Sequence, residues 1–254
     1  MKRIIKTTIF AYLAGVVLTF LATISYFYFR SIYFFLAVFT ISFAISYTMP
    51  FWFQLLFKAK LYKGNLRQKI LDQARSYKVS LVEIYEKKSD RSNATAMGFA
   101  NTKRIFIDSN TLQKHPTAEI EAVIAHELGH HKNLDVYRLT ALVAATLAIL
   151  SALNLYLYDF FEFQNLITLV YISAATFLPA LLILLAINRK IEDQADKFAF
   201  KKLKNPEQLG NFLTRAMEQD KVQKKQLDKN IHSLFKLFLT HRFIYERIKL
   251  SQTA

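Results

Sequence analysis

The sequence predicts a mainly α, polytopic membrane protein with about four transmembrane helices and a cytoplasmic α+β domain. Hydrophobic residues make up 53% of the 254 residues, including 23 Phe, and only 5 Gly and 4 Pro interrupt them. This composition is too apolar for an ordinary soluble domain. Four long blocks contain no charged residue: Thr7–Phe29, Ser31–Phe57, Leu139–Tyr158 and Phe163–Asn188. Each reaches the roughly 20 residues with which a helix crosses a bilayer.

Basic residues flank these blocks and predict the orientation of the helices. We expect a multi-pass protein of the cell (inner) membrane. The basic residues gather before the first block and after the second and fourth, whereas the turn between the third and fourth blocks holds only Asp159 and Glu162. Because positive residues stay on the cytoplasmic side, we expect both termini to be cytoplasmic, with Arg30 the single exception. The net charge of +15 then reflects flanks that face anionic lipids of the bilayer. No nucleic-acid partner is expected.

This pattern divides the chain into four segments. Residues 1–57 and 139–188 are expected to form two transmembrane hairpins, and residues 58–138 and 189–254 two cytoplasmic parts. In the first cytoplasmic part, amphipathic spacing over Leu61–Ala74 predicts a helix. Alternating β-branched and turn residues then predict a short β-sheet. Its three strands are expected at Val79–Tyr85, Ala94–Ala100 and Arg104–Asp108.

The next helix starts near Pro116 and carries two histidines four residues apart, His126 and His130. Positions i and i+4 lie on one face of a helix, so both imidazoles can bind one metal ion. The chain has no cysteine, so its ligands must be His and carboxylate. Zinc suits two imidazoles, one further ligand and an open position for water. Glu127 can reach that water without ligating the metal, as a general base must. The alternative is a solvated helix face, and His131 is expected to support the site or to be exposed.

The third ligand is expected from residues 189–254, immediately after the fourth apolar block. Glu192 and Asp196 stand one turn apart there on a predicted helix. The third and fourth helices are antiparallel neighbours, so both motifs emerge side by side, about 15 Å or less above the membrane. Glu192 can complete the site, and Asp196 can accept a hydrogen bond from a ligand imidazole. The alternative for both is a salt-bridged helix surface.

Three motifs resemble the HtpX-like membrane zinc metalloproteases, relatives of the CaaX prenyl proteases. They are "HELGH" at His126–His130, "EDQAD" at Glu192–Asp196 and "NATAMG" at Asn93–Gly98. The resemblance covers nearly the whole chain and implies a zincin-like catalytic domain with one zinc ion. It also implies Glu-assisted hydrolysis of peptide bonds in cytoplasmic segments of membrane-protein or misfolded polypeptide substrates. Such an endopeptidase serves protein quality control and stress response.

The same resemblance assigns four further residues. Asn93 and Ala94 are expected on an edge strand that binds extended substrate through main-chain hydrogen bonds. Near the C-terminus, "THRFIYERI" resembles the family's H-P-x-x-x-x-R-I, with Arg242 in place of the proline. The resemblance implies that His241 approaches the metal and stabilises the oxyanion, while Arg247 organises the site. The alternative is a basic helix end on a basic protein.

Four other functions compete with this interpretation. An intramembrane zinc protease would bury its motif in an apolar helix, but charged residues flank this one. A zinc-protease receptor of the β-lactam-sensor type would need an extracellular sensor domain after the last helix, and a prenyl protease proper would need more transmembrane helices. A non-catalytic membrane scaffold with structural zinc would have no use for Glu127 beside an open coordination position.

Overall fold

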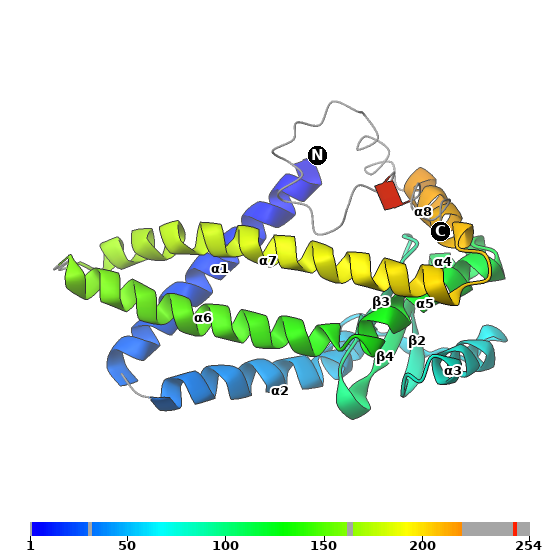
Figure 1. Cartoon of the computed structure of the whole chain (residues 1–254), viewed down its shortest axis with the longest axis horizontal. Helices are drawn as coiled ribbons and strands as arrows, with labels where there is room; N and C mark the ends of the chain where they lie inside the picture. Colours follow the sequence, from blue (N-terminus) through cyan, green and yellow to red (C-terminus); the bar gives the residue numbers. More distant parts are fainter. Residues whose placement is uncertain (1, 30–31, 162–164, 220–245, 248–254) are drawn as a thin grey trace. The chain divides into compact units, whose positions relative to one another are not determined.

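The computed structural model describes residues 2–29, 32–161, 165–219 and 246–247 (Figure 1). Helices dominate the described chain, and four short strands form one sheet. The elements in chain order are α1 (Lys2–Phe29), α2 (Ile32–Leu56), β1 (Lys60–Leu61), α3 (Leu66–Ser76), β2 (Glu83–Lys87), β3 (Ala94–Met97), the 3-10 turn η1 (Ala100–Thr102), β4 (Arg104–Asp108), α4 (Ser109–Lys114), α5 (Thr117–Lys132), α6 (Asp135–Phe160), α7 (Leu166–Lys202) and α8 (Glu207–Gln219).

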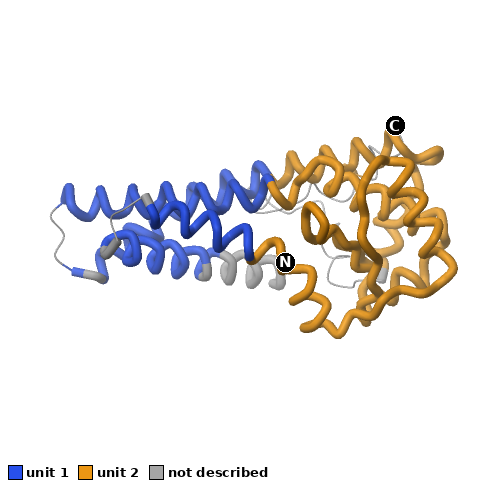
Figure 2. The backbone as a smooth tube through the Cα atoms, turned by 90° about the horizontal axis from the view of Figure 1, so that it is seen from below, with its two compact units in different colours: residues 1–44, 138–187 blue, residues 45–137, 188–254 orange. Residues whose placement is uncertain are grey.

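The chain forms two compact units, coloured separately in Figure 2. Unit 1 comprises residues 1–44 and 138–187, and unit 2 comprises residues 45–137 and 188–254. Three helices, α2, α6 and α7, contribute residues to both units. Unit 1 therefore consists of helices alone within the described residues, whereas unit 2 contains the sheet.

Apolar helices of membrane-spanning length confirm the predicted fold class. Within the described residues, three helices are long and apolar enough to cross a membrane: Tyr33–Leu56, Asp135–Phe160 and Ile167–Lys202. A shorter apolar helical stretch, Gly15–Phe27, lies in α1. Large apolar side chains stand exposed along all four helices, among them Leu18 at 55%, Leu36 at 57%, Ile149 at 66% and Ile183 at 60%. Contiguous apolar surface of this extent requires an apolar surrounding, and a lipid bilayer supplies one.

A buried polar cluster joins three helices inside unit 1. The amide nitrogen of Asn154, on α6, donates hydrogen bonds to Thr23 Oγ1 on α1 at 3.3 Å and to Ser173 Oγ on α7 at 3.1 Å. The hydroxyl of Thr176 donates back to Asn154 Oδ1 at 2.7 Å. Asn154, Thr23 and Ser173 are all buried. Hydrogen bonds between helices are an established source of helix association where no water competes.

The sheet of unit 2 has the strand order β1-β2-β4-β3. The central pair, β2 and β4, is parallel, whereas β1 and β3 run antiparallel to their neighbours. Ile84 of β2 and Ile105 and Ile107 of β4 are fully buried against the helices. Because side chains alternate along a strand, Arg104, Phe106 and Asp108 point to the opposite face. β3 forms one edge of the sheet.

The end of α2 packs against that opposite face. The rings of Phe53 and Phe106 lie 4.8 Å apart between centroids. The guanidinium of Arg104 lies 4.0 Å from the centre of the Phe51 ring, and Lys87 forms an ion pair with the buried Asp108 at 2.8 Å. Aromatic and cation–π contacts therefore hold the last turns of α2 on the sheet.

The predicted elements of unit 2 are largely present, with shifted ends. The strand predicted at Arg104–Asp108 is β4 without change, and the strand predicted at Ala94–Ala100 ends at Met97. The strand predicted at Val79–Tyr85 begins only at Glu83, because the main chain of Val79 still caps α3 through Ala74 O at 2.9 Å. β1 and the short helix α4 were not predicted from the sequence.

Helix α5 approaches α7 closely at Gly129. A Cβ atom at this position would lie 3.2 Å from Cα of Ala195 and 3.2 Å from the Phe198 ring. Leu128 on the same helix is fully buried in the core of unit 2. A methyl group at residue 129 would require these neighbours to shift by a few tenths of an ångström, and a branched side chain would push α5 and α7 apart.

We expect Gly129→Val to destabilise unit 2, whereas Gly129→Ala should be nearly neutral. The valine overpacks the α5–α7 contact at a cost of about 1–3 kcal/mol. The alanine also meets Ala195 and Phe198, but its higher helix propensity offsets up to about 1 kcal/mol. Thermal unfolding of the purified protein in detergent measures both variants. A valine variant as stable as the parent protein would contradict the close packing.

Candidate functional site

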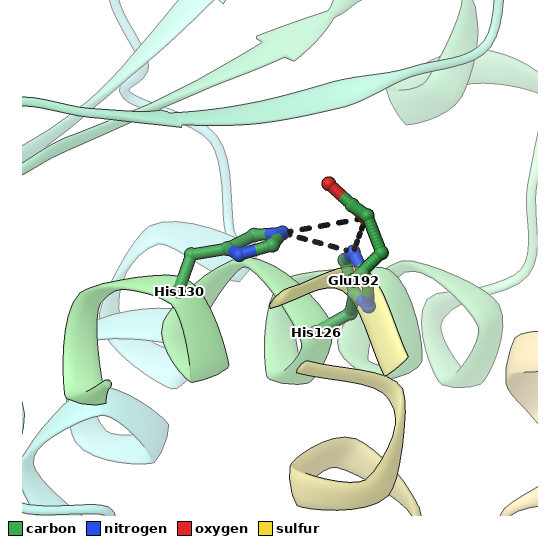
Figure 3. A group of neighbouring side chains, drawn as sticks. All are labelled: His126, His130 and Glu192. Carbon is green, nitrogen blue, oxygen red and sulfur yellow. Dashed lines mark hydrogen bonds and ion pairs between the residues drawn. The ribbon is translucent and has the colours of Figure 1, made fainter. Parts of the chain in front are cut away.

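Three side chains from two helices of unit 2 converge on one point. His126 and His130 project from α5 toward Glu192 on α7, and strands of the sheet run across the other side of the group (Figure 3). The Nε2 atoms of the two histidines lie 3.2 Å apart. Oε2 of Glu192 lies 3.4 Å from His126 Nε2 and 3.7 Å from His130 Nε2. The three ligand atoms therefore form a compact group that can hold a metal ion.

Two further carboxylates face the outer nitrogens of these histidines. Nδ1 of His126 lies 2.8 Å from Asp196 Oδ1, and Nδ1 of His130 lies 3.0 Å from Asp135 Oδ2. A carboxylate at Nδ1 favours the tautomer with its proton on that atom. In that tautomer both Nε2 lone pairs point toward each other and toward Glu192, and a cation at the centre would relieve the repulsion.

Asp135 was not anticipated as part of the site. It follows His130 by five residues, beyond the end of α5, and begins α6. Leu134 adopts a positive φ of 59°, which reverses the chain and returns Asp135 to the histidine. The sequence does contain a signal, an acidic residue at a helix start, but that position is also common for helix capping alone.

Arg247 fixes Asp196 from the C-terminal end of the chain. Its Nε and Nη2 atoms donate to the two carboxylate oxygens of Asp196, each at 2.7 Å. Both side chains are buried. From the sequence, Arg247 was expected to organise the site, and the structure places it in contact with Asp196. His241 lies outside the described residues.

Negative charge predominates around the two histidines. Burial alone lowers the pKa of His130, but its contacts with Asp135 and Glu192 outweigh burial and raise that pKa to about 10. Burial opposes the charge of His126 too, yet Asp196 and Glu192 raise its pKa. Burial likewise opposes ionisation of Asp196, but His126 and Arg247 hold the pKa of its carboxyl well below the ordinary range. The site thus favours positive charge at its centre.

Glu127 borders the group without belonging to it. Its side chain is buried, and its Oε2 accepts a hydrogen bond of 2.6 Å from the main-chain N–H of Ala96 on β3. Burial raises the pKa of the Glu127 carboxyl, although the neighbouring histidines and the Ala96 N–H act in the opposite direction. A buried carboxyl with a raised pKa beside a metal site is suited to accept a proton.

The environment of His131 differs from the one expected from the sequence. It was expected to support the site or to be exposed, but only 2% of it is exposed and its Nε2 lies 3.2 Å from the carbonyl oxygen of Arg104. Burial lowers its pKa to about 4, so the ring is neutral. The side chain points about a quarter turn away from His130, which directs it into the contact between α5 and β4.

Asn93 and Ala94 lie where β3 begins, at the edge of the sheet. The carbonyl oxygen of Asn93 is already paired, because it accepts from the Asp108 N–H at 2.9 Å and from Thr111 Oγ1 at 3.1 Å. Ala94 starts β3 with its Cβ buried in the core. Asn93 therefore anchors the strand, and the main chain of Ala94 faces the free edge.

The comparisons with known proteins agree with this arrangement. The model of peptidase family M48 matches residues 60–253. A protease HtpX homologue from Bacteroides fragilis (strain YCH46) is 29% identical over 191 residues, which cover 63% of this chain and 59% of that protein. A CAAX prenyl protease 1 homologue from Arabidopsis thaliana is 42% identical over 74 residues, 27% of this chain and 18% of that protein.

The fold has a solved counterpart. The crystal structure of S. mikatae Ste24p matches with a TM-score of 0.70 and 21% identity over 98% of this chain and 65% of that chain. The chain thus spans less than two thirds of the length of each of these relatives. Its apolar helices are those of a multi-pass membrane protein. Since the family model covers most of the sequence, the chain belongs to peptidase family M48, a metalloprotease family, as the HtpX-like motifs predict.

Proposed function

We propose that the protein is a membrane-embedded zinc endopeptidase. The observation that carries the proposal is the group of His126, His130 and Glu192, with Glu127 beside it but not among the three ligand residues. A closed structural site has four protein ligands, whereas the part of the chain that the structure describes offers three, with a buried carboxylate beside them. This combination supports hydrolysis over a purely structural metal.

Zinc fits the donor set and its dimensions. Two imidazole nitrogens and one carboxylate oxygen form a common catalytic zinc site, with metal–ligand distances of about 2.0–2.2 Å. Tetrahedral geometry at that distance separates the ligand atoms by about 3.3 Å. The three separations here are 3.2, 3.4 and 3.7 Å. We therefore expect one zinc ion per chain.

The residues of the site would then have distinct roles in peptide hydrolysis. When bound, zinc acts as a Lewis acid and lowers the pKa of water at its open position. Glu127 takes a proton from the attacking water as general base and delivers it to the amine leaving group. Asp196 and Asp135 hold the imidazoles in the tautomer that binds metal. Arg247 balances the charge of Asp196, and we infer that His241 stabilises the oxyanion.

Substrates are proposed to be extended polypeptides in cytoplasmic segments of membrane or misfolded proteins, as in quality control. An extended peptide can add to the free edge of β3, where main-chain groups supply affinity at every second residue. Both curated relatives named above are called proteases. The cytoplasmic, inner-membrane orientation rests on the basic residues that flank the apolar helices.

We expect Glu127→Gln to retain zinc and the fold but to abolish cleavage. The amide keeps the shape of the carboxylate and cannot accept the proton. General-base catalysis contributes roughly 100-fold or more, so turnover should fall below about a hundredth of the parent value. Casein cleavage and zinc content are measured on the same preparation, with and without chelator. Turnover above about a tenth of the parent value would exclude this role.

We expect Glu192→Ala to lose zinc and Asp196→Asn to retain it with affinity weakened roughly 10–100-fold. Glu192 contributes a ligand atom, whereas Asp196 contacts only the outer nitrogen of His126. Competition with a chelator of known affinity measures both variants. Full zinc occupancy in Glu192→Ala would reassign the third ligand. His131 cannot take that role while it faces the sheet, so His241 would be tested next.

Cleavage is expected outside the transmembrane span of a substrate. Glu192 follows the last residue of the fourth uncharged block, Asn188, by four residues. A strand paired with β3 needs several extended residues of about 3.3 Å each to reach the site. A membrane-anchored substrate should be cut faster than its soluble counterpart, because tethering raises its local concentration. One cleavable sequence placed at increasing distances from an anchor, with mass-spectrometric product mapping, tests this. Efficient cuts inside the anchor's apolar span would refute it.

A further inference from the structure

The free edge of β3 carries few main-chain donors. Asn93 and Asp108 form a hydrogen-bonded pair, through the Asp108 N–H and the Asn93 carbonyl. Antiparallel ladders alternate hydrogen-bonded and non-hydrogen-bonded pairs, so Thr95 is bonded to β4 as well. Ala94 and Ala96 are the intervening residues, and their N–H and C=O groups point away from β4. The free edge of the strand therefore offers two outward N–H groups within Ala94–Met97.

One of these two donors is already engaged. The Ala96 N–H donates to Oε2 of Glu127 at 2.6 Å, across 31 residues of sequence. The distance is typical of a strong hydrogen bond to an ionised acceptor. Glu127 itself is buried, so little water competes for this hydrogen bond. The catalytic helix and the substrate strand are thereby joined by one main-chain hydrogen bond.

We propose that the main-chain N–H of Ala96 is a positioning group for Glu127 and is unavailable to substrate. The hydrogen bond holds Oε2 against β3 and leaves Oε1 as the oxygen that exchanges the proton. The proposal rests on the function proposed above and specifies how that site orients its base.

The hydrogen bond from Ala96 to Glu127 also determines which main-chain groups of β3 a substrate can use. An added strand can exchange both hydrogen bonds with Ala94, through its N–H and its C=O. At Ala96 only the carbonyl remains, so the substrate carbonyl opposite it has no donor on β3. Ala94 therefore contributes to substrate binding, and Ala96 contributes through Glu127 to the chemical step.

Amide hydrogen exchange tests the hydrogen bond without reference to activity. In the full-length protein, the Ala96 amide should exchange at least about tenfold faster in Glu127→Ala than in the parent. The Thr95 and Ala94 amides should keep their rates, since neither donates to Glu127. Equal rates of the Ala96 amide in the two proteins would overturn the proposal. Acceleration at Thr95 to the same extent would also overturn it, because it would indicate a general loosening of β3.

A matched pair of ester substitutions separates the two roles. Replacing Ala96 or Ala94 by lactic acid removes one outward N–H without adding bulk. Each ester also weakens one inward-facing carbonyl, that of Thr95 or of Asn93, so the effect on the ladder is similar. Zinc content and unfolding temperature of both proteins are compared with the parent before any kinetics.

The two esters should have opposite kinetic effects. The Ala96 ester should lower kcat about tenfold or more with KM within about twofold, because it disorders the general base. The Ala94 ester should raise KM about three- to tenfold with kcat nearly unchanged, because it removes a substrate hydrogen bond. An Ala96 ester with unchanged kcat, or one that raises KM alone as the Ala94 ester does, would overturn the proposal. Absence of cleavage by the parent protein would instead refute the proposed function, and the exchange result would still stand.

Discussion

The close contact of α5 with α7 is the constraint on which the site depends. His126 and His130 need only a helical turn to meet, but Glu192 comes from a different helix. Gly129 lies between the two histidines on α5, and the absence of a side chain there lets Ala195 approach within van der Waals distance. Ala195 directly precedes Asp196, so the same approach brings both Glu192 and Asp196 to the histidines. Ligand and supporting carboxylate thus share one packing contact.

The electrostatics follow from that convergence. Carboxylates of Glu127, Glu192, Asp135 and Asp196 gather around two imidazoles, and Arg247 is the permanent cation that contacts the group among the described residues. Burying this many acidic groups costs free energy unless each is paired. Asp196 is paired with Arg247 and His126, and Glu127 has a main-chain donor. A divalent cation at the centre would balance the excess of negative charge, so the arrangement argues for a metal independently of the family.

The features that local spacing determines could be predicted from the sequence. The i, i+4 histidines, the apolar blocks and strand β4 depend on periodicity, which the sequence displays directly. Asp135 was missed because its approach to His130 depends on the positive φ of Leu134, a conformation that its residue type does not favour. His131 was misjudged because a quarter turn on a helix gives the direction of a side chain and not what packs there. The first strand was placed too early, since Val79 is β-branched yet serves as the cap of α3.

Under the proposed function, the free edge strand β3 must bind an extended peptide and also avoid indiscriminate pairing with other chains. An unpaired edge strand invites association with other chains, and proteins normally cover it or shorten it. A protease that binds extended peptides needs such an edge, so it cannot remove it. Here β3 spans only Ala94–Met97, and one of its outward donors is bonded to Glu127. A shortened edge, capped by the residue proposed as general base, limits indiscriminate strand pairing and keeps Ala94 available. The same hydrogen bond would then hold Glu127 in register with whatever peptide the strand accepts.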